Sequence, residues 1–226
     1  MNRALLCSLF PIPCSLTAMP TLGVTGGLAS GKSAACRLLK KYGATVFSAD
    51  EAARAVLSVG NGLLEAIACE FGADVLLADG TLDRATLGKL IFTDPAARQR
   101  LDSLTHPPIL RLLHAQMETA RYESCAGMVI AVEVPLLFET NLSDWFDRIA
   151  VVDASETLHV ERLRLRNNLN EAEARRRLAA QWPLSRKCEL ADYILSNDGP
   201  AQELETAVQN LLMRLREEFS VPPEKK

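Results

Sequence analysis

The segment from Gly26 to Ser33 constrains the fold of this chain more than any other part of the sequence. It reads G-x-x-x-x-G-K-S, with an apolar run before it at 22–24 and a helical pattern after it at 33–41. Glycines let the backbone curl with its N–H groups pointing inward, and the following helix N-terminus favours negative charge. A Gly/Ser-rich turn could spell the pattern by chance, but the flanking strand and helix favour a phosphate-binding loop.

The side chains and the backbone of this loop have different expected roles. Lys32 is expected to reach the outer phosphates of a nucleoside triphosphate, and the hydroxyl of Ser33 is expected to bind Mg²⁺. The other nucleotide contacts predicted in this loop lie along its backbone, at Gly26, Gly27, Ala29, Ser30, Gly31 and Ala34.

Length and composition allow one sizeable α/β domain, because the chain has 226 residues and 48% of them are hydrophobic. The net charge of −3 gives no support to a nucleic-acid or membrane-surface role. The six cysteines form no C-x-x-C pair, which favours free thiols in a reducing, cytoplasmic compartment. No apolar run approaches the ~18 residues that are needed to span a bilayer.

Residues 1–20 are predicted to be an N-terminal extension outside the folded domain. Their apolar stretch at 4–10 is followed by Pro11 and Pro13, which gives a faint resemblance to a signal peptide. The favoured interpretation is that Met19, rather than Met1, is the true start, and that 1–18 are a loose tail or the product of a misplaced start. A second tail is expected at 220–226.

Five apolar runs of strand length alternate with helical patterns along the chain, at 22–25, 45–47, 128–132, 149–153 and 193–195. This order predicts an α/β fold with a five-stranded parallel sheet and helices on both faces. The helical stretch at 51–127, which we call the helical block, is longer than a plain crossover needs. We interpret it as an insertion that binds an acceptor, with helix breaks at 72–80 and at 106–108 and a helix start at Asp94–Pro95.

Two acidic residues follow predicted strands, where ligands bind in open α/β sheets. Asp50 comes just after the second strand, and its alternative role is to cap a helix that begins at Glu51. Glu133 ends the third strand and could hold Mg²⁺ through water, or it could be a structural acid.

Residues 155–190, which we call the lid segment, are rich in arginine. The pattern predicts two helices with a turn near 167–170, where Asn170 and Glu173 resemble a capping pair. A solvated helix pair of mixed charge is one interpretation. The other is a mobile flap whose arginines stabilise a phosphoryl group in transfer, with Arg162, Arg166 and Arg177 as candidates.

Taken together, these features resemble the dephospho-CoA kinase family over residues 21–219. The match is carried by the following residues in chain order: Thr25, Gly26, Gly27, Gly31, Lys32, Ser33, Ala49, Asp50, Ala78 to Leu82, His106, Pro107, Val134 to Glu139, Gln181, Ala191, Asp192 and Asn197 to Gly199. The phosphate loop alone would indicate only a superfamily. The run from Pro135 to Glu139, preceded by Asp50 and His106–Pro107, is far more specific.

The resemblance implies a P-loop nucleoside-triphosphate hydrolase fold and transfer of the ATP γ-phosphoryl group to the ribose 3′-hydroxyl of dephospho-CoA. It implies ATP and Mg²⁺ as cofactors, a nucleotide core, a helical CoA-binding part and a lid. It casts Asp50 as the base at the acceptor hydroxyl. Nucleotide contacts are also expected at Asn197 and Gly199, and acceptor contacts at Arg54, His106, Pro135, Leu136, Leu137 and Phe138. Alternatively, Arg54 is a surface charge, His106 fixes a helix break, and the last three are core residues.

The sequence departs from the family pattern at two positions. Ser48 stands where the family usually has an aspartate, and Ala34 stands where it usually has a threonine. The alternative function is another small-molecule P-loop kinase, acting on a nucleoside monophosphate or a sugar. A GTPase is disfavoured because the N-K-x-D motif is absent, and Asp50 argues against a non-catalytic module. A small-molecule substrate and a monomer or weak oligomer are expected.

Overall fold

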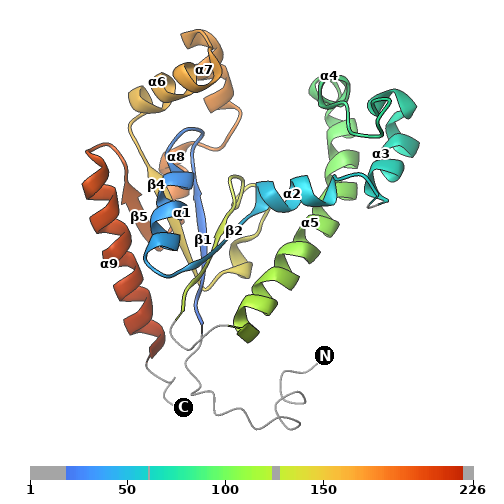
Figure 1. The fold of residues 1–226 in the computed structure, drawn as a ribbon. Helices are drawn as coiled ribbons and strands as arrows, with labels where there is room; N and C mark the ends of the chain where they lie inside the picture. Colours follow the sequence, from blue (N-terminus) through green and yellow to red (C-terminus); the bar gives the residue numbers. More distant parts are fainter. Residues whose placement is uncertain (1–18, 61, 124–127, 221–226) are drawn as a thin grey trace, which may run out of the picture.

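The computed structural model describes residues 19–60, 62–123 and 128–220 (Figure 1). The predictions made for 1–18, for Cys125 and for 221–226 lie outside these ranges. A single parallel sheet has the strand order β2-β3-β1-β4-β5, which confirms the predicted five-stranded α/β fold. Its strands are β1 Thr21–Gly26, β2 Thr45–Ser48, β3 Ile130–Glu133, β4 Arg148–Asp153 and β5 Tyr193–Ser196.

Helices connect these strands. They are α1 Lys32–Lys41, α2 Ala49–Val56, α3 Leu63–Phe71, α4 Arg84–Thr93, α5 Pro95–Glu123, α6 Glu156–Asn167, α7 Glu171–Ala179, α8 Leu184–Glu189 and α9 Ala201–Ser220, with short 3₁₀ turns η1 Ala73–Val75 and η2 Ser143–Trp145. None of the described helices is long and apolar enough to cross a membrane.

Apolar side chains leave the sheet on both faces, because successive residues of a strand point in opposite directions. On one face Leu22 and Val24 pack with Leu39 of α1 and Val208 of α9. On the other face, side chains of β3 and β4 pack with α5 and with the turn after β3; they include Ile130, Val132, Val151, Leu113, Met117 and Leu137. Helices therefore cover both faces, as the sequence predicts.

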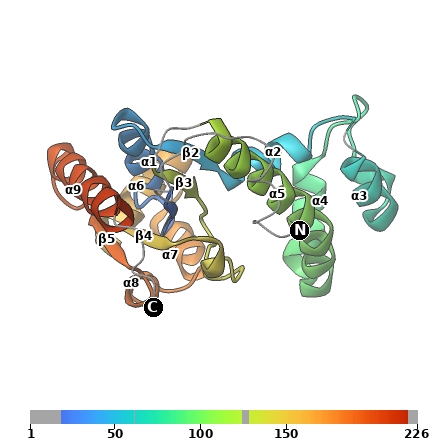
Figure 2. The same cartoon turned by 90° about the horizontal axis from the view of Figure 1, so that it is seen from below.

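The helical block has a separate small core around Ile67, Val75 and Leu87. Figures 1 and 2 show α3 and α4 standing clear of the sheet, with α5 running from them back to the sheet. The α6–α7 pair lies on the other side of the carboxyl end of the sheet (Figure 1). The carboxyl ends of the strands therefore lie between two helical projections.

The predicted helix break at 106–108 is wrong. Helix α5 runs without interruption from Pro95 to Glu123 and contains both Pro107 and Pro108. An interior proline costs a helix about 3 kcal/mol or more, but buried α5 residues on both sides of the prolines, from Ala97 to Ala120, anchor the helix by packing. The predicted helix start is confirmed, since the Asp94 carboxylate accepts the Ala96 N–H at 2.8 Å.

The lid segment contains the two predicted helices, α6 and α7, and a third one, α8, that the sequence pattern did not indicate. Asn168 ends α6 in the left-handed conformation, and Asn170 begins α7 with the expected capping box, in which Glu173 is the partner. Helix α8 has only six residues, which is too short for a periodic pattern to reveal.

Candidate active site

The phosphate loop between β1 and α1 needs glycine for two measurable reasons. Gly31 has a φ of +102°, and a Cβ there would lie 2.1 Å from the side-chain nitrogen of Asn197. A Cβ on Gly27 would lie 2.8 Å from the imidazole of His159. A substitution would therefore have to displace the side chain of Asn197 or His159, and at Gly31 it would also meet a strained backbone.

Asn197 braces this loop from the end of β5. Its side-chain amide donates to the Ser30 carbonyl oxygen at 2.7 Å, and its backbone N–H donates to the Asp153 carbonyl oxygen at 2.7 Å. Gly199 follows two residues later, before α9 begins. Of the nucleotide contacts predicted outside the loop, Asn197 thus lies against it.

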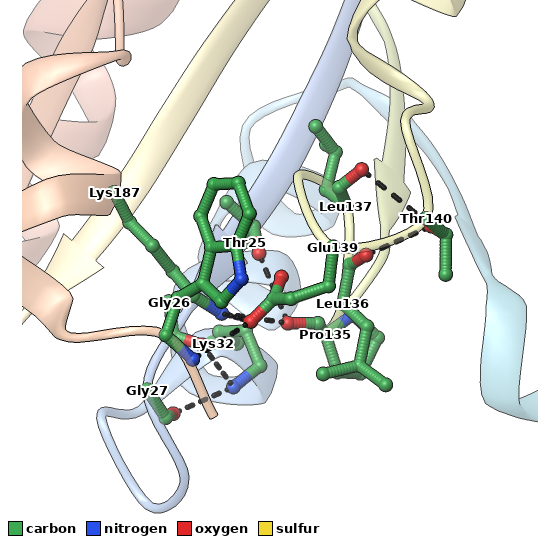
Figure 3. Close-up of polar contacts among 11 residues, drawn as sticks. Thr25, Gly26, Gly27, Lys32, Pro135, Leu136, Leu137, Glu139, Thr140 and Lys187 are labelled. Atoms are coloured by element: carbon green, nitrogen blue, oxygen red, sulfur yellow. Dashed lines mark hydrogen bonds and ion pairs between the residues drawn. The ribbon is translucent and has the colours of Figure 1, made fainter. Parts of the chain in front are cut away.

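Lys32 is buried beneath the loop and points at its backbone (Figure 3). Its ammonium donates to the carbonyl oxygens of Gly27 at 2.7 Å and Gly26 at 3.3 Å. Burial lowers the pKa of Lys32 from 10.5 to about 8, and the charge of Glu133 opposes this shift. A desolvated cation that is held only by carbonyl oxygens gains greatly from an anion placed beside it.

Ser33 and Glu133 meet next to Lys32. The Ser33 hydroxyl donates to a Glu133 carboxylate oxygen at 2.9 Å, and Glu133 ends β3, which pairs with β1 and β2. Oxygen donors of this kind suit Mg²⁺, which usually takes one or two protein ligands and completes its shell with water and phosphate. Among the described residues no group of three or more metal-binding side chains occurs, so such an ion would need that completion.

Asp50 is exposed in the first turn of α2, near the same edge of the sheet. Its charge acts on Lys32, which places it within electrostatic reach of the phosphate loop. The alternative role of Asp50 as a helix cap is not supported, because α2 begins at Ala49 and the side chain of Ser48 accepts the Glu51 N–H at 3.4 Å. The carboxylate of Asp50 therefore remains available for chemistry.

The three candidate lid arginines are placed differently. Arg162 is half-buried and donates to the Asn197 carbonyl oxygen at 2.9 Å, so it lies beside the loop brace. Arg166 is exposed at the end of α6, and its charge acts on Lys32. Arg177 is exposed in the last turn of α7. Arg162 is therefore tied to the loop brace by a hydrogen bond, and the charge of Arg166 reaches Lys32.

The acceptor candidates do not form one group. Leu137 and Phe138 are buried in the core under the sheet, whereas Pro135 and Leu136 are half-buried in the turn that follows β3. Arg54 is exposed one turn after Asp50 on α2. His106 is on α5, where its nearest acidic partner is Asp102 at 3.7 Å.

Comparison with known proteins agrees with this geometry. A family model described as dephospho-CoA kinase matches residues 20–203. The chain belongs to the dephospho-CoA kinase family. Among its relatives, the dephospho-CoA kinase of Anaeromyxobacter dehalogenans is 42% identical over 198 residues, which are 88% of this chain and 93% of the relative. The dephospho-CoA kinase of Geobacillus kaustophilus is 38% identical over 183 residues, which are 81% of this chain and 90% of the relative.

Two solved structures resemble this fold. A dephospho-CoA kinase from Campylobacter jejuni superimposes with a TM-score of 0.64 at 27% identity, covering 88% of this chain and 98% of that one. A protein from Thermus thermophilus superimposes with a TM-score of 0.73 at 31% identity, covering 88% and 99%.

The two departures from the family pattern have local explanations. Ser48 occupies the N-cap of α2, a position that serine and aspartate fill about equally well, so the helix start is preserved. The N–H of Ala34 donates to the Gly31 carbonyl oxygen at 2.9 Å in the first turn of α1, a bond that needs no side chain at this position.

Sequence reasoning missed two residues near the site. Lys187 is one basic residue of the lid segment with no signal of its own, and Glu139 enters only as part of the resemblance. The structure pairs them, with the Lys187 ammonium 2.7 Å from the Glu139 carboxylate and the lysine side chain fully buried. No periodic or motif signal in the sequence links these two residues, because one precedes β4 along the chain and the other follows it.

Proposed function

We propose that the chain transfers the γ-phosphoryl group of ATP to the ribose 3′-hydroxyl of dephospho-CoA, which gives coenzyme A and ADP. The observation that carries this proposal is the convergence of Lys32, the Ser33–Glu133 pair and Asp50 at the carboxyl edge of β1, β3 and β2. Membership of the dephospho-CoA kinase family supports the identity of the acceptor.

The residues have separate roles in this proposal. The loop N–H groups and Lys32 bind the phosphates. Ser33, and Glu133 through water, would hold Mg²⁺, which would neutralise charge on the phosphates. Asp50 accepts the proton of the acceptor hydroxyl or orients that hydroxyl toward the γ-phosphorus. Arg162 and Arg166 are the lid arginines that approach the transferred group when the lid segment closes.

The helical block and the turn at Pro135–Leu136 bind the acceptor in this proposal. A long acceptor allows contacts remote from the reacting hydroxyl, and such contacts can position it for transfer. The block, with its separate core, provides surface for them. The division into a helical acceptor-binding part at 51–127 and a lid at 155–190 is part of the proposal.

The experiment is to incubate the protein with Mg-ATP and a panel of acceptors and to follow ADP release. Dephospho-CoA is expected to be used far better than AMP, adenosine or a free sugar. Equal specificity constants for dephospho-CoA and adenosine would contradict the proposal, and preference for a nucleoside monophosphate or a sugar would favour the alternative kinase.

The pKa of Lys32 predicts that ATP affinity depends on pH. Since the ligand-free pKa is about 8, the ammonium is mostly charged at pH 7 and mostly neutral at pH 9. If only the charged form binds, affinity should fall about ten-fold between these values. The ligand-free fold should show the opposite trend and gain stability as the pH rises from 8 toward the unfolded value of 10.5.

Titration of ATP binding at pH 7, 8 and 9 checks this prediction, with Lys32→Arg as the matched control. The guanidinium stays charged over this range, so the variant should lose the pH dependence even if its overall affinity is lower. A wild-type affinity that does not change with pH would contradict the prediction.

A further inference from the structure

The buried pair formed by Lys187 and Glu139 lies where three segments meet. Lys187 of α8 is fully buried, and its ammonium contacts the Glu139 carboxylate at 2.7 Å and donates to the Pro135 carbonyl oxygen at 3.3 Å. Removing a charged pair from water is costly, and apolar residues of similar size often replace one without loss of stability. Stability alone is therefore a weak explanation for this pair.

The Pro135 carbonyl oxygen joins the pair to the phosphate loop. It accepts the hydroxyl of Thr25 at 3.2 Å as well as the ammonium of Lys187 (Figure 3). Thr25 is in β1, directly before the first loop residue, Gly26. One oxygen atom therefore connects the strand that leads into the loop with the turn at 135–138.

Glu139 joins the pair to the base of the lid segment. The carboxylate oxygen that contacts Lys187 also accepts the backbone N–H of Trp182 at 3.2 Å, in the segment between α7 and α8. The guanidinium of Arg186 stacks 3.7 Å from the centre of the Trp182 ring. The chain that returns from the lid helices is thus fixed to the same carboxylate that fixes the turn.

Two buried oxygen atoms at this junction have no hydrogen-bond partner within the described structure. They are the second carboxylate oxygen of Glu139 and the side-chain oxygen of Gln181, the residue before Trp182. Unpaired buried acceptors destabilise the arrangement that contains them. A shift of the turn or of the lid base that brings in a donor would therefore be favourable.

We propose that Lys187 and Glu139 are positioning residues that set the turn at 135–138 relative to the phosphate loop and couple it to the base of the lid. The inference rests on the proposed function, because it takes this turn as part of the acceptor site. Displacement of the turn should misplace the acceptor hydroxyl, and small misplacements reduce transfer steeply. The charge of Lys187 acts on Lys32, but neither side chain of the pair bonds to the loop or to its Asn197 brace. Removing Lys187 and Glu139 together removes both signs of charge, so ATP binding should be little affected.

A pair of variants separates positioning from stability. Lys187→Met alone leaves a buried carboxylate without its cation and should lower Tm by roughly 10 °C. The double variant Lys187→Met/Glu139→Gln removes both charges and retains an acceptor for the Trp182 N–H. Its Tm should therefore return most of the way to the wild-type value. Its kcat/KM for dephospho-CoA should nevertheless stay about 10–100-fold below wild type, with an unchanged Kd for ATP.

The matched control is Lys41→Met/Glu205→Gln, which removes a Lys–Glu pair between α1 and α9 in which Lys41 is exposed and Glu205 half-buried. It should change neither rate nor ATP binding. Recovery of both Tm and kcat/KM in the Lys187→Met/Glu139→Gln variant would overturn the inference, as would a loss of ATP affinity as large as the loss of rate. If the wild type itself does not phosphorylate dephospho-CoA, the proposed function fails instead.

Fluorescence tests the coupling with a readout other than rate or Tm. The chain has two tryptophans, so Trp145→Phe leaves Trp182 as the only tryptophan. Addition of dephospho-CoA to this variant should change the Trp182 emission. The change should disappear in a protein that combines Trp145→Phe with Lys187→Met/Glu139→Gln. No change in the Trp145→Phe protein, or the same change in both proteins, would contradict the coupling.

Discussion

Replacing Lys32 by alanine is expected to abolish turnover, with a fall in kcat/KM of about 10³-fold or more, roughly 4 kcal/mol of transition-state stabilisation. The ammonium lies directly under the loop and is the cation best placed to bind the β- and γ-phosphates. Lys187 is fully buried and engaged with Glu139, and Arg166 is at the end of α6. Neither is placed to substitute for it.

The fold should tolerate this change, since Lys32 is a buried cation held only by loop carbonyls and its removal relieves a desolvated charge. We expect an unchanged or slightly raised Tm in the absence of ATP. The control is Lys41→Ala at the other end of the same helix, which should retain activity. Steady-state kinetics beside thermal unfolding makes the comparison, and near-normal activity of the Lys32 variant would refute the phosphate-loop assignment.

Replacing Asp50 by asparagine is expected to slow phosphoryl transfer by about 10²–10⁴-fold, roughly 3–5 kcal/mol of barrier. Asparagine keeps the shape and still accepts a hydrogen bond, but it is a poor base. ATP binding should be nearly unchanged, because the phosphate cradle consists of the loop backbone, Lys32 and Ser33. The start of α2 should also be unaffected, since Ser48 is its cap.

Single-turnover kinetics beside an ATP titration of the Asp50 variant tests this expectation. The matched control is Glu51→Gln, the neighbouring acid in the first turn of α2, which is exposed and should have little effect on the rate. An unchanged chemical step would remove Asp50 from the mechanism. A loss of ATP affinity as large as the loss of rate would do the same.

Local sequence patterns predicted most of the phosphate loop and of the sheet that carries it. The phosphate loop has a backbone signature of its own, and buried parallel strands appear as continuous apolar runs, so Lys32, Ser33 and the five strands could be assigned from sequence. Because parallel strands end at one edge of a sheet, the meeting of Ser33 with Glu133 could also be anticipated.

Features that depend on distant contacts could not be predicted in this way. Asn197 donates to Ser30 across 167 residues, and no local pattern indicates that bond. The continuity of α5 through Pro107 and Pro108 depends on packing against other elements, which overrides the local preference against proline. The burial of Lys187 is of the same kind, since a lysine is expected at the surface unless a partner such as Glu139 is known.

The central claim is that this chain phosphorylates the ribose 3′-hydroxyl of dephospho-CoA. Phosphorus NMR of the product formed from dephospho-CoA and Mg-ATP tests it most directly, because the signal of a new phosphomonoester shows coupling to the ribose proton at the esterified carbon. We predict one new monoester, coupled to the 3′ proton, in an amount equal to the ADP formed. Release of ADP without a new monoester, or a monoester on another hydroxyl, would contradict the claim.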